Sequence, residues 1–202
     1  MKASVGIICN SLEKPSPAYV AWIKTYAIEN GGLIEFWNHG LNHKWKPVEF
    51  NGTDLAFQLD HLTTPNRLMK EATGITFHTF GAPFNQSDAV TEQALSQVPD
   101  LKAWLFGPEK TGKDMRQPLV LKRSLTLEYD VGKISAEKFM EDYPKKAQGE
   151  PYLVLQGHPG SWNDDSFKNF TTIADRLAAD GWTFITPYEY FQTVSRPPAD
   201  KK

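Results

Sequence analysis

The chain has 202 residues, of which 40% are hydrophobic, and its formal net charge is −2. This length predicts one domain with a sizeable core, and the weak negative charge argues against nucleic acid or an anionic membrane as the main partner. No apolar run approaches the roughly 18 residues that a membrane span needs.

The first residues, from Met1 to Cys9, contain a short apolar stretch and no clear cleavage site. We therefore predict no signal peptide, and the cytoplasm is the default expectation for localisation. Cys9 is the only cysteine, which excludes an internal disulfide and a metal site built from several cysteines. Because it ends an apolar strand-like segment, we expect a small buried side chain rather than a nucleophile.

Short apolar segments alternate with longer amphipathic segments along the chain. The apolar periodicity predicts strands at 3–9, 33–37, 75–80, 103–106, 119–127, 152–156 and 182–185. It predicts helices at 17–29, 53–73, 91–98, 136–143 and 165–180. This alternation is typical of a parallel sheet, open or closed, that is wrapped by helices.

Two of the remaining segments are polar. We expect a loop at 109–117 and a frayed tail at 196–202, which leaves one domain over residues 1–195. Three further segments, at 38–43, 81–85 and 157–162, each follow a predicted strand and contain histidine, amide or aromatic side chains. In parallel α/β folds, functional residues collect at the carboxyl ends of the strands. We therefore expect these three segments to converge on one site.

His39 and His43 are the strongest candidates for metal ligands. Histidines four residues apart on one face of a helical turn can reach the same cation, and Asn38 and Asn42 could orient them by hydrogen bonding. The alternative is a pair of ordinary surface or capping histidines. Outside this pair, His61 is expected on the surface of a helix, and His78 lies in a predicted strand that could face either layer.

His158 is a candidate general acid. It leaves a predicted buried strand into a Gly/Pro turn, and the unperturbed pKa of histidine lies near 6.5, which suits proton transfer. The alternative is a strand-end histidine that bonds to a local carbonyl group.

Three motifs, in chain order, resemble those of the polysaccharide deacetylases (family 4 carbohydrate esterases): His39-Gly-Leu-Asn-His43, Gly81-Ala-Pro83-Phe84 and Leu155-Gln-Gly-His158. The closing stretch, 173–191, resembles the terminal helix–strand unit of that family, so the likeness spans most of the chain. The resemblance implies an α/β fold, a distorted (β/α) barrel. It also implies a divalent cation, commonly zinc, that activates water against an acetyl group on an oligo- or polysaccharide.

The resemblance also implies roles for single residues. His39 and His43 match the two metal-binding histidines, and His158 matches the histidine that protonates the leaving group. Pro83 and Phe84 match a Pro-aromatic turn whose backbone N–H helps to form the oxyanion site, a stabilising device in acyl transfer.

Two departures from the family pattern predict impaired or absent turnover. The family's first strand carries two adjacent Asp residues, a catalytic base and a third metal ligand, and that strand would lie before Met1. The first strand of the barrel is therefore expected to be missing. Gly81 stands where the family usually has an Arg. The Asp that partners the late histidine is a third open point, for which Glu128 or Asp130 could substitute.

Aromatic residues near the predicted site suggest a rival function. Trp37, Trp45, Phe84 and Trp162 could stack on sugar rings, so the chain could be a carbohydrate-binding module without catalysis. Ordinary core packing is the alternative for each of them, and it is the expectation for Trp22, Trp104 and Trp182. A third possibility is a metal-dependent hydrolase that acts on a non-sugar amide.

Overall fold

The structure, a computed structural model, describes residues 1–108 and 118–195. The predicted loop at 109–117 and the predicted tail at 196–202 lie outside the described residues. The chain divides into two compact units: Met1–Leu121 with Phe184–Lys202, and Lys122–Thr183. The expectation of one domain over residues 1–195 stays a prediction.

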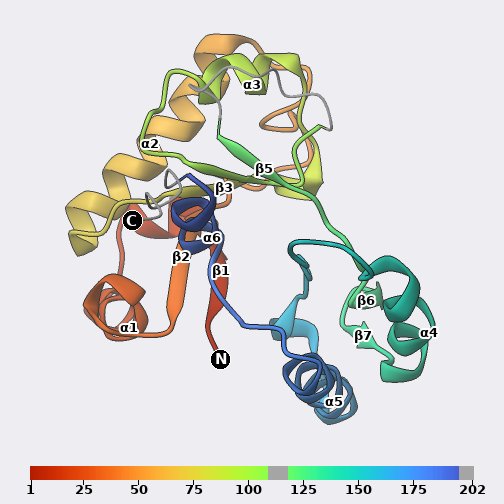
Figure 1. Cartoon of the computed structure of the whole chain (residues 1–202). Coiled ribbons are helices and arrows are strands. Elements are labelled where there is room, and N and C mark those ends of the chain that lie inside the picture. Colours follow the sequence, from red (N-terminus) through yellow and green to blue (C-terminus); the bar gives the residue numbers. More distant parts are fainter. Residues whose placement is uncertain (109–117, 196–202) are drawn as a thin grey trace, which may run out of the picture. The chain divides into compact units, whose positions relative to one another are not determined.

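The first unit contains a parallel sheet whose strand order follows the chain order (Figure 1). Its strands are β1 (Ala3–Ile7), β2 (Ile34–Asn38), β3 (Thr79–Gly81), β4 (Ala103–Leu105) and β5 (Leu119–Leu121). Helices α1 (Pro17–Tyr26), α2 (Leu55–Thr73) and α3 (Ala89–Leu95) lie between the first four strands in sequence, as parallel crossovers require. The predicted α/β class with a parallel sheet is confirmed.

Alternate residues of β2 point to opposite faces of the sheet. On one face, Phe36 packs edge-on against Trp22 of α1, with ring centroids 5.2 Å apart, and Asn38 Nδ2 donates to the Leu62 carbonyl of α2 at 3.1 Å. On the other face, Glu35 accepts a hydrogen bond from the backbone N–H of Tyr188 in α6 (Pro187–Val194) at 3.0 Å. Both faces of β2 are therefore covered, as is usual for parallel sheets.

The helix ends follow local capping rules. Asp54 caps α2 by accepting from the N–H of Phe57, and Gly74, at φ 82°, ends this helix. Asp88 and Thr91 form a capping box at the start of α3, which begins before the predicted residue 91. Thr186 and Glu189 form a second capping box at the start of α6, a helix that was not predicted from the sequence.

The second unit contains a hairpin of β6 (Glu128–Asp130) and β7 (Lys133–Ile134), followed by α4 (Ala136–Lys146) and α5 (Asp164–Ala179). The predicted strands at 152–156 and 182–185 are wrong, because in the described chain neither segment joins a sheet. The predicted strand at 119–127 is shortened to β5. An apolar run indicates burial, but a strand also needs a neighbour for its backbone hydrogen bonds. Residues 152–156 are accordingly half-buried rather than buried.

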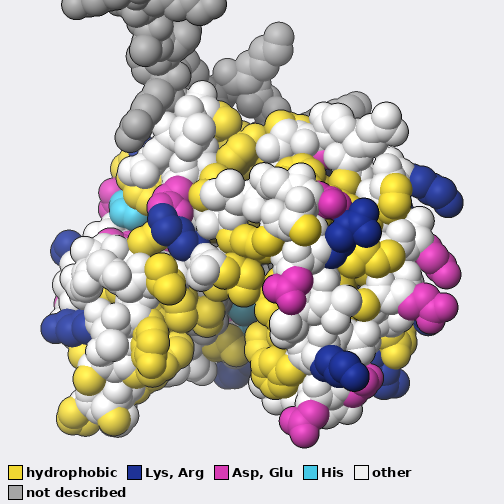
Figure 2. Space-filling model, turned by 60° about the horizontal axis from the view of Figure 1, so that its bottom comes forward, with side chains coloured by type: hydrophobic (Ala, Val, Ile, Leu, Met, Phe, Trp, Pro, Cys, Tyr) yellow, Lys and Arg dark blue, Asp and Glu magenta, His cyan; other side chains and the backbone are white. Residues whose placement is uncertain are grey.

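The surface carries exposed hydrophobic side chains among charges of both signs (Figure 2). Trp22, which we expected in the core, is 41% exposed: its ring packs edge-on against Phe36, and its other ring neighbours are Tyr19 and Tyr26 of the same helix. Trp104 is fully buried as predicted, and so is Cys9, whose pKa burial raises to about 12. None of the helices in the described ranges has the length and apolar character that crossing a bilayer requires.

Glu35 gives β2 a testable pH dependence. Its side chain lies among buried groups, and burial raises the pKa of Glu35 above 4.5 although Thr79 Oγ1 donates to it at 2.5 Å. Above about pH 4.5 the Glu35 carboxyl is therefore ionised in the unfolded chain but still protonated in the folded chain. The free energy of unfolding then falls by up to about 1.4 kcal/mol per pH unit until the folded carboxyl ionises as well. Urea unfolding across pH should show this component in the unmodified chain and not in Glu35→Gln. If the free energy of unfolding changed equally with pH in the unmodified chain and in Glu35→Gln, the prediction would be contradicted.

Candidate functional site

A turn after β2 brings His39 and His43 together. The ring centroids lie 4.9 Å apart at an angle of 58°. The predicted helical turn is wrong, since residues 39–44 contain no helix and the chain reverses at Gly40 (φ 74°) and His43 (φ 51°). The expected proximity of the two histidines is nevertheless present.

The neighbouring strands of the sheet fix His39. Its backbone N–H donates to the Ile7 carbonyl of β1 at 3.0 Å, and its Nδ1 lies 2.7 Å from the Gly81 carbonyl of β3. A carbonyl only accepts, so Nδ1 carries the hydrogen and the ring lone pair lies on Nε2. This tautomer suits a histidine that ligates a metal through Nε2.

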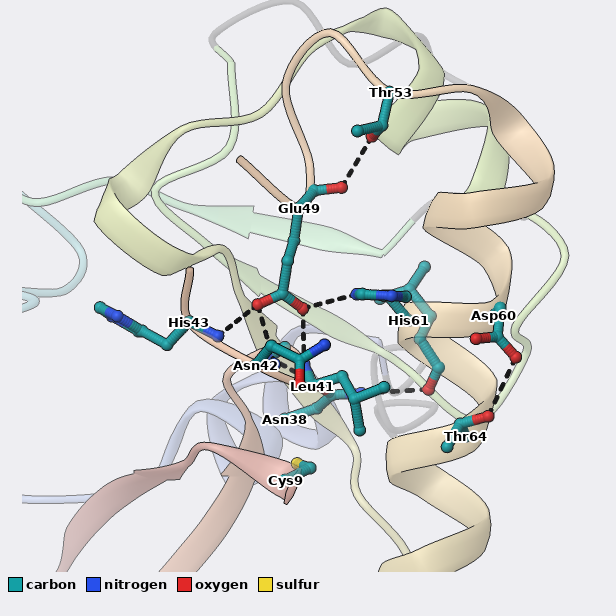
Figure 3. A network of polar contacts seen from close by, with 12 residues as sticks. Cys9, Asn38, Leu41, Asn42, His43, Glu49, Thr53, Asp60, His61 and Thr64 are labelled. Atoms are coloured by element: carbon teal, nitrogen blue, oxygen red, sulfur yellow. Dashed lines mark hydrogen bonds and ion pairs between the residues drawn. The ribbon is translucent and has the colours of Figure 1, made fainter. Parts of the chain in front are cut away.

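Glu49 organises the turn, and the sequence analysis did not find it. Figure 3 shows its carboxylate pointing at the turn, while the ring of His43 extends away from it. One oxygen accepts from the N–H of Leu41 at 2.7 Å, and the other accepts from Asn42 at 2.9 Å and from His43. The only sequence signal is an acidic residue between Val48 and Phe50, in a segment for which no strand or helix was predicted.

His61 of α2 is the fourth partner of Glu49, with Nδ1 2.8 Å from the carboxylate. The expectation of an exposed His61 is wrong, because this residue is 7% exposed and its ring stacks on Phe57. Burial by itself raises the pKa of Glu49, but the hydrogen bonds from His61 and from the turn outweigh burial and hold this pKa below its ordinary value. Glu49 is therefore a buried, ionised acceptor.

Trp37 lies beside His39, in edge-on contact with ring centroids 4.9 Å apart. Its ring covers glycines on both neighbouring strands: a Cβ on Gly6 or on Gly81 would lie 2.7 Å from a ring carbon of Trp37. This packing explains why position 81 holds no Arg, since any side chain there would meet the indole. The expectation that Trp37 contacts a substrate stays a prediction.

The predicted Pro-aromatic turn lies beside the histidines. Its 3-10 helix, Pro83–Asn85, holds Phe84 at φ 59° and ψ 11°, a left-handed conformation that is uncommon for a bulky residue. Pro83 is buried, whereas the Phe84 ring is 36% exposed and its centroid lies 4.3 Å from that of His43. Trp45, 57% exposed, packs edge-on against Phe84 at 4.6 Å, which completes an aromatic edge next to the histidines.

His158 belongs to the second unit, where Glu128 holds it. The Glu128 carboxylate accepts from the backbone N–H of His158 at 2.7 Å and lies 2.6 Å from its Nδ1. The same carboxylate accepts from Trp162 Nε1 at 2.5 Å. Burial raises the pKa of Glu128, but the bonds from His158 and Trp162 more than compensate and lower it. Of the two expected partners of His158, the structure selects Glu128, while Asp130 pairs with Lys133 at 3.0 Å.

The contacts of Trp162 differ from those of an open sugar platform. Its ring packs on Phe167 and Phe170 of α5, with centroids 5.1 and 5.0 Å away. Its role as a substrate contact stays a prediction. The convergence of His158 with His39 and His43 also stays a prediction, because His158 lies in the second unit and the other two lie in the first.

The histidine pair fits part of a metal site. Imidazole nitrogen suits zinc and other transition metals, and the fixed tautomer of His39 supplies one such donor. Within residues 1–108 and 118–195, however, no group of three or more His, Cys, Asp or Glu residues is placed to hold a metal ion. His39 and His43 therefore provide two ligand positions, one fewer than the three protein ligands usual in catalytic zinc sites.

No protein-family model matches the sequence, and no curated protein matches it. Solved structures do match. The Xyl-CE4 domain of a multidomain xylanase from the hindgut metagenome of Trinervitermes trinervoides has a TM-score of 0.66 and 13% identity, over 98% of this chain and 80% of that domain.

Two further structures extend this similarity. A family 4 acetyl xylan esterase from Clostridium thermocellum, in complex with a cobalt ion, has a TM-score of 0.63 and 15% identity, over 97% of this chain and 80% of the esterase. A mutant of a family 4 pseudoenzyme from Bacillus anthracis has a TM-score of 0.60 and 12% identity, over 91% of this chain. This chain spans only 54% of that pseudoenzyme's length.

These similarities define the class of fold. Across most of its length the chain has the fold of the family 4 carbohydrate esterases, the polysaccharide deacetylases, a scaffold that includes both enzymes and pseudoenzymes. Identities of 12–15% support the fold and not an activity, so function has to be argued from the site.

Proposed function

We propose that this chain is a carbohydrate deacetylase-like protein that binds a divalent cation, with zinc as the expected metal, through His39 and His43. The observation that carries the proposal is the histidine pair itself, with rings 4.9 Å apart and Nδ1 of His39 committed to the Gly81 carbonyl. The proposed substrate is an acetylated oligo- or polysaccharide, because the exposed aromatic edge of Phe84 and Trp45 adjoins the pair and aromatic faces stack on sugar rings.

In the proposed reaction, the residues of the chain would have separate roles. A bound cation polarises an acetyl carbonyl and acidifies water. His39 and His43 hold the cation, and the Phe84 turn borders the place where the acetyl group would lie. Glu128 holds Nδ1 of His158, and the role proposed for this histidine is to carry a proton for the leaving group on Nε2.

We further propose that turnover by this chain is impaired. Two histidines hold zinc less firmly than three ligands do. The described residues also place no carboxylate with the histidine pair as a third ligand, and the lack of a positioned general base should cost about two to four orders of magnitude in rate.

The second candidate is a carbohydrate-binding protein without catalysis. Its specific support is Trp45, 57% exposed beside Phe84, since a large exposed aromatic ring is typical of a sugar-stacking surface. The similarity to a pseudoenzyme is compatible with it.

Metal content and acetate release test the two candidates together. We expect zinc or cobalt to bind to the unmodified chain and to be lost in His39→Ala, and acetylated xylan or chitin oligomers to release acetate slowly in a His39-dependent manner. His78→Ala is the control, since this ring stacks on Tyr188 and bonds to the Asp100 carbonyl. Sugar binding without acetate release would favour the second candidate. If the unmodified chain bound neither a metal nor a sugar, both candidate functions would be overturned.

A further inference from the structure

We propose that Glu49 is a positioning residue that fixes the turn 39–43 so that His39 and His43 are held ready for one cation. This inference rests on the proposed metal binding by the two histidines. Glu49 lies outside the matched motifs. Its buried charge would set the geometry of the two histidine ligands without contacting the metal.

The first step is the arrangement of backbone donors around Glu49. Three successive N–H groups, those of Leu41, Asn42 and His43, converge on one carboxylate whose side chain is 1% exposed. Successive amides that point at one anion form a concave anion-binding nest. Here the anion is part of the chain, and it satisfies donors that the sharp turn would otherwise leave unpaired.

The second step is the fixed position of the carboxylate itself. His61 Nδ1 holds one oxygen at 2.8 Å, and the ring of His61 stacks on Phe57 with centroids 3.9 Å apart. Both residues belong to α2, a helix of 19 residues, and Thr53 Oγ1 donates to the Glu49 carbonyl at 2.8 Å just before it (Figure 3). The turn is therefore tied through Glu49 to a rigid element.

The third step connects the turn to the histidine rings. A Cβ on Gly40 would lie 3.0 Å from a Glu49 oxygen and 2.9 Å from Pro83, so the turn fits closely between this carboxylate and the Pro83–Asn85 helix. His43 has φ 51°, a left-handed conformation that is uncommon for residues other than glycine and that the contacts of the turn help to hold. Without the carboxylate, the backbone of His43 can relax and its ring can leave the position beside Phe84.

The metal affinity of Glu49→Gln tests the proposal. A glutamine of the same size presents an NH₂ group to backbone N–H donors, so the nest loses an acceptor and its charge. We expect Zn²⁺ and Co²⁺ to bind about 10–100-fold more weakly in calorimetric titrations, the range found when groups that orient metal ligands are changed. The visible absorption spectrum of bound Co²⁺ should change as well. Glu71→Gln, at an exposed residue that pairs with Arg67 on α2, is the matched control and should bind like the unmodified chain.

Chemical rescue separates positioning from general stability. In Glu49→Ala the empty nest should accept formate, and added formate should restore much of the Co²⁺ affinity there but not raise it in the unmodified chain. Unchanged affinity in a folded Glu49→Gln chain would overturn the proposal, as would a lack of rescue in a folded Glu49→Ala chain.

Amide hydrogen exchange tests the anchoring of the turn directly in the metal-free, unmodified chain, without any substitution. We expect the N–H groups of residues 41–43 to exchange at least about 100-fold more slowly than in an unstructured peptide, and rates close to the peptide values would overturn the anchoring. If the unmodified chain bound no metal, the proposed function would fail, whereas the exchange result would still decide whether Glu49 holds the turn.

Discussion

Replacement of Glu128 by Ala is expected to lower the free energy of unfolding by about 2–4 kcal/mol, because one buried carboxylate serves three donors and hydrogen bonds to charged groups are worth more than neutral ones. The donors are His158 N at 2.7 Å, His158 Nδ1 at 2.6 Å and Trp162 Nε1 at 2.5 Å, and the Glu128 side chain is only 6% exposed. Urea unfolding of the full chain at neutral pH measures the change.

Asp130→Ala is the control, since Asp130 belongs to the same strand but its side chain is 60% exposed and pairs with Lys133. It should leave the stability close to that of the unmodified chain, because an exposed ion pair contributes little. The pKa of Glu128 is lowered in the folded chain, so the stability that it contributes is complete at neutral pH and is lost as the pH falls through that lowered value. The difference between the unmodified chain and Glu128→Ala should therefore shrink in acid. Equal losses in the two variants at neutral pH would contradict the role of Glu128.

Replacement of Gly81 by Ala is the second large effect that we expect. The new Cβ would lie 2.7 Å from a ring carbon of Trp37, and a Cβ on Gly6 would lie as close to the same ring, so the indole packs closely on the backbone of both neighbouring strands. Overpacking of this kind costs about 1–3 kcal/mol. The backbone of Gly81 is ordinary β-strand, so the loss would arise from sterics alone.

A double-mutant cycle identifies the cause of this loss. In a Trp37→Leu background the ring carbons are gone, and Gly81→Ala should then cost about 0.5 kcal/mol or less. Gly160→Ala is a control, since a Cβ at that glycine meets nothing within 4 Å. The same cost of Gly81→Ala with and without the indole would show that Trp37 is not what keeps position 81 free of a side chain.

The sequence predicted the parts of the site that local patterns encode. Apolar runs followed by helical periodicity indicated β1, β2, α1 and α2, and hence a parallel sheet with polar residues at its strand ends. The spacing of His39 and His43 indicated their proximity, although the turn between them is not helical. The motif order gave the expected fold, which the structural similarity confirms.

Some strand predictions failed because an apolar run indicates a preference for burial but does not show whether the segment has a neighbouring strand to pair with. Residues 152–156 are apolar enough for a strand, yet in the described chain they meet no neighbouring strand and remain half-buried. Residues 182–185 likewise join no sheet, and the capping box of Thr186 and Glu189 begins a helix immediately afterwards.

The sequence by itself therefore determined the order of the elements from β1 to β5 and the candidate ligands, because each of these depends on residues close together in the chain. Only the tertiary structure decided which side chains meet. It placed Glu49 against the backbone of the histidine turn and His61 of α2, Glu128 against His158 and Trp162, and Trp37 across two glycines on neighbouring strands. These contacts join different elements, and no periodicity in the sequence records the partner that a buried carboxylate or an indole finds once the elements have packed.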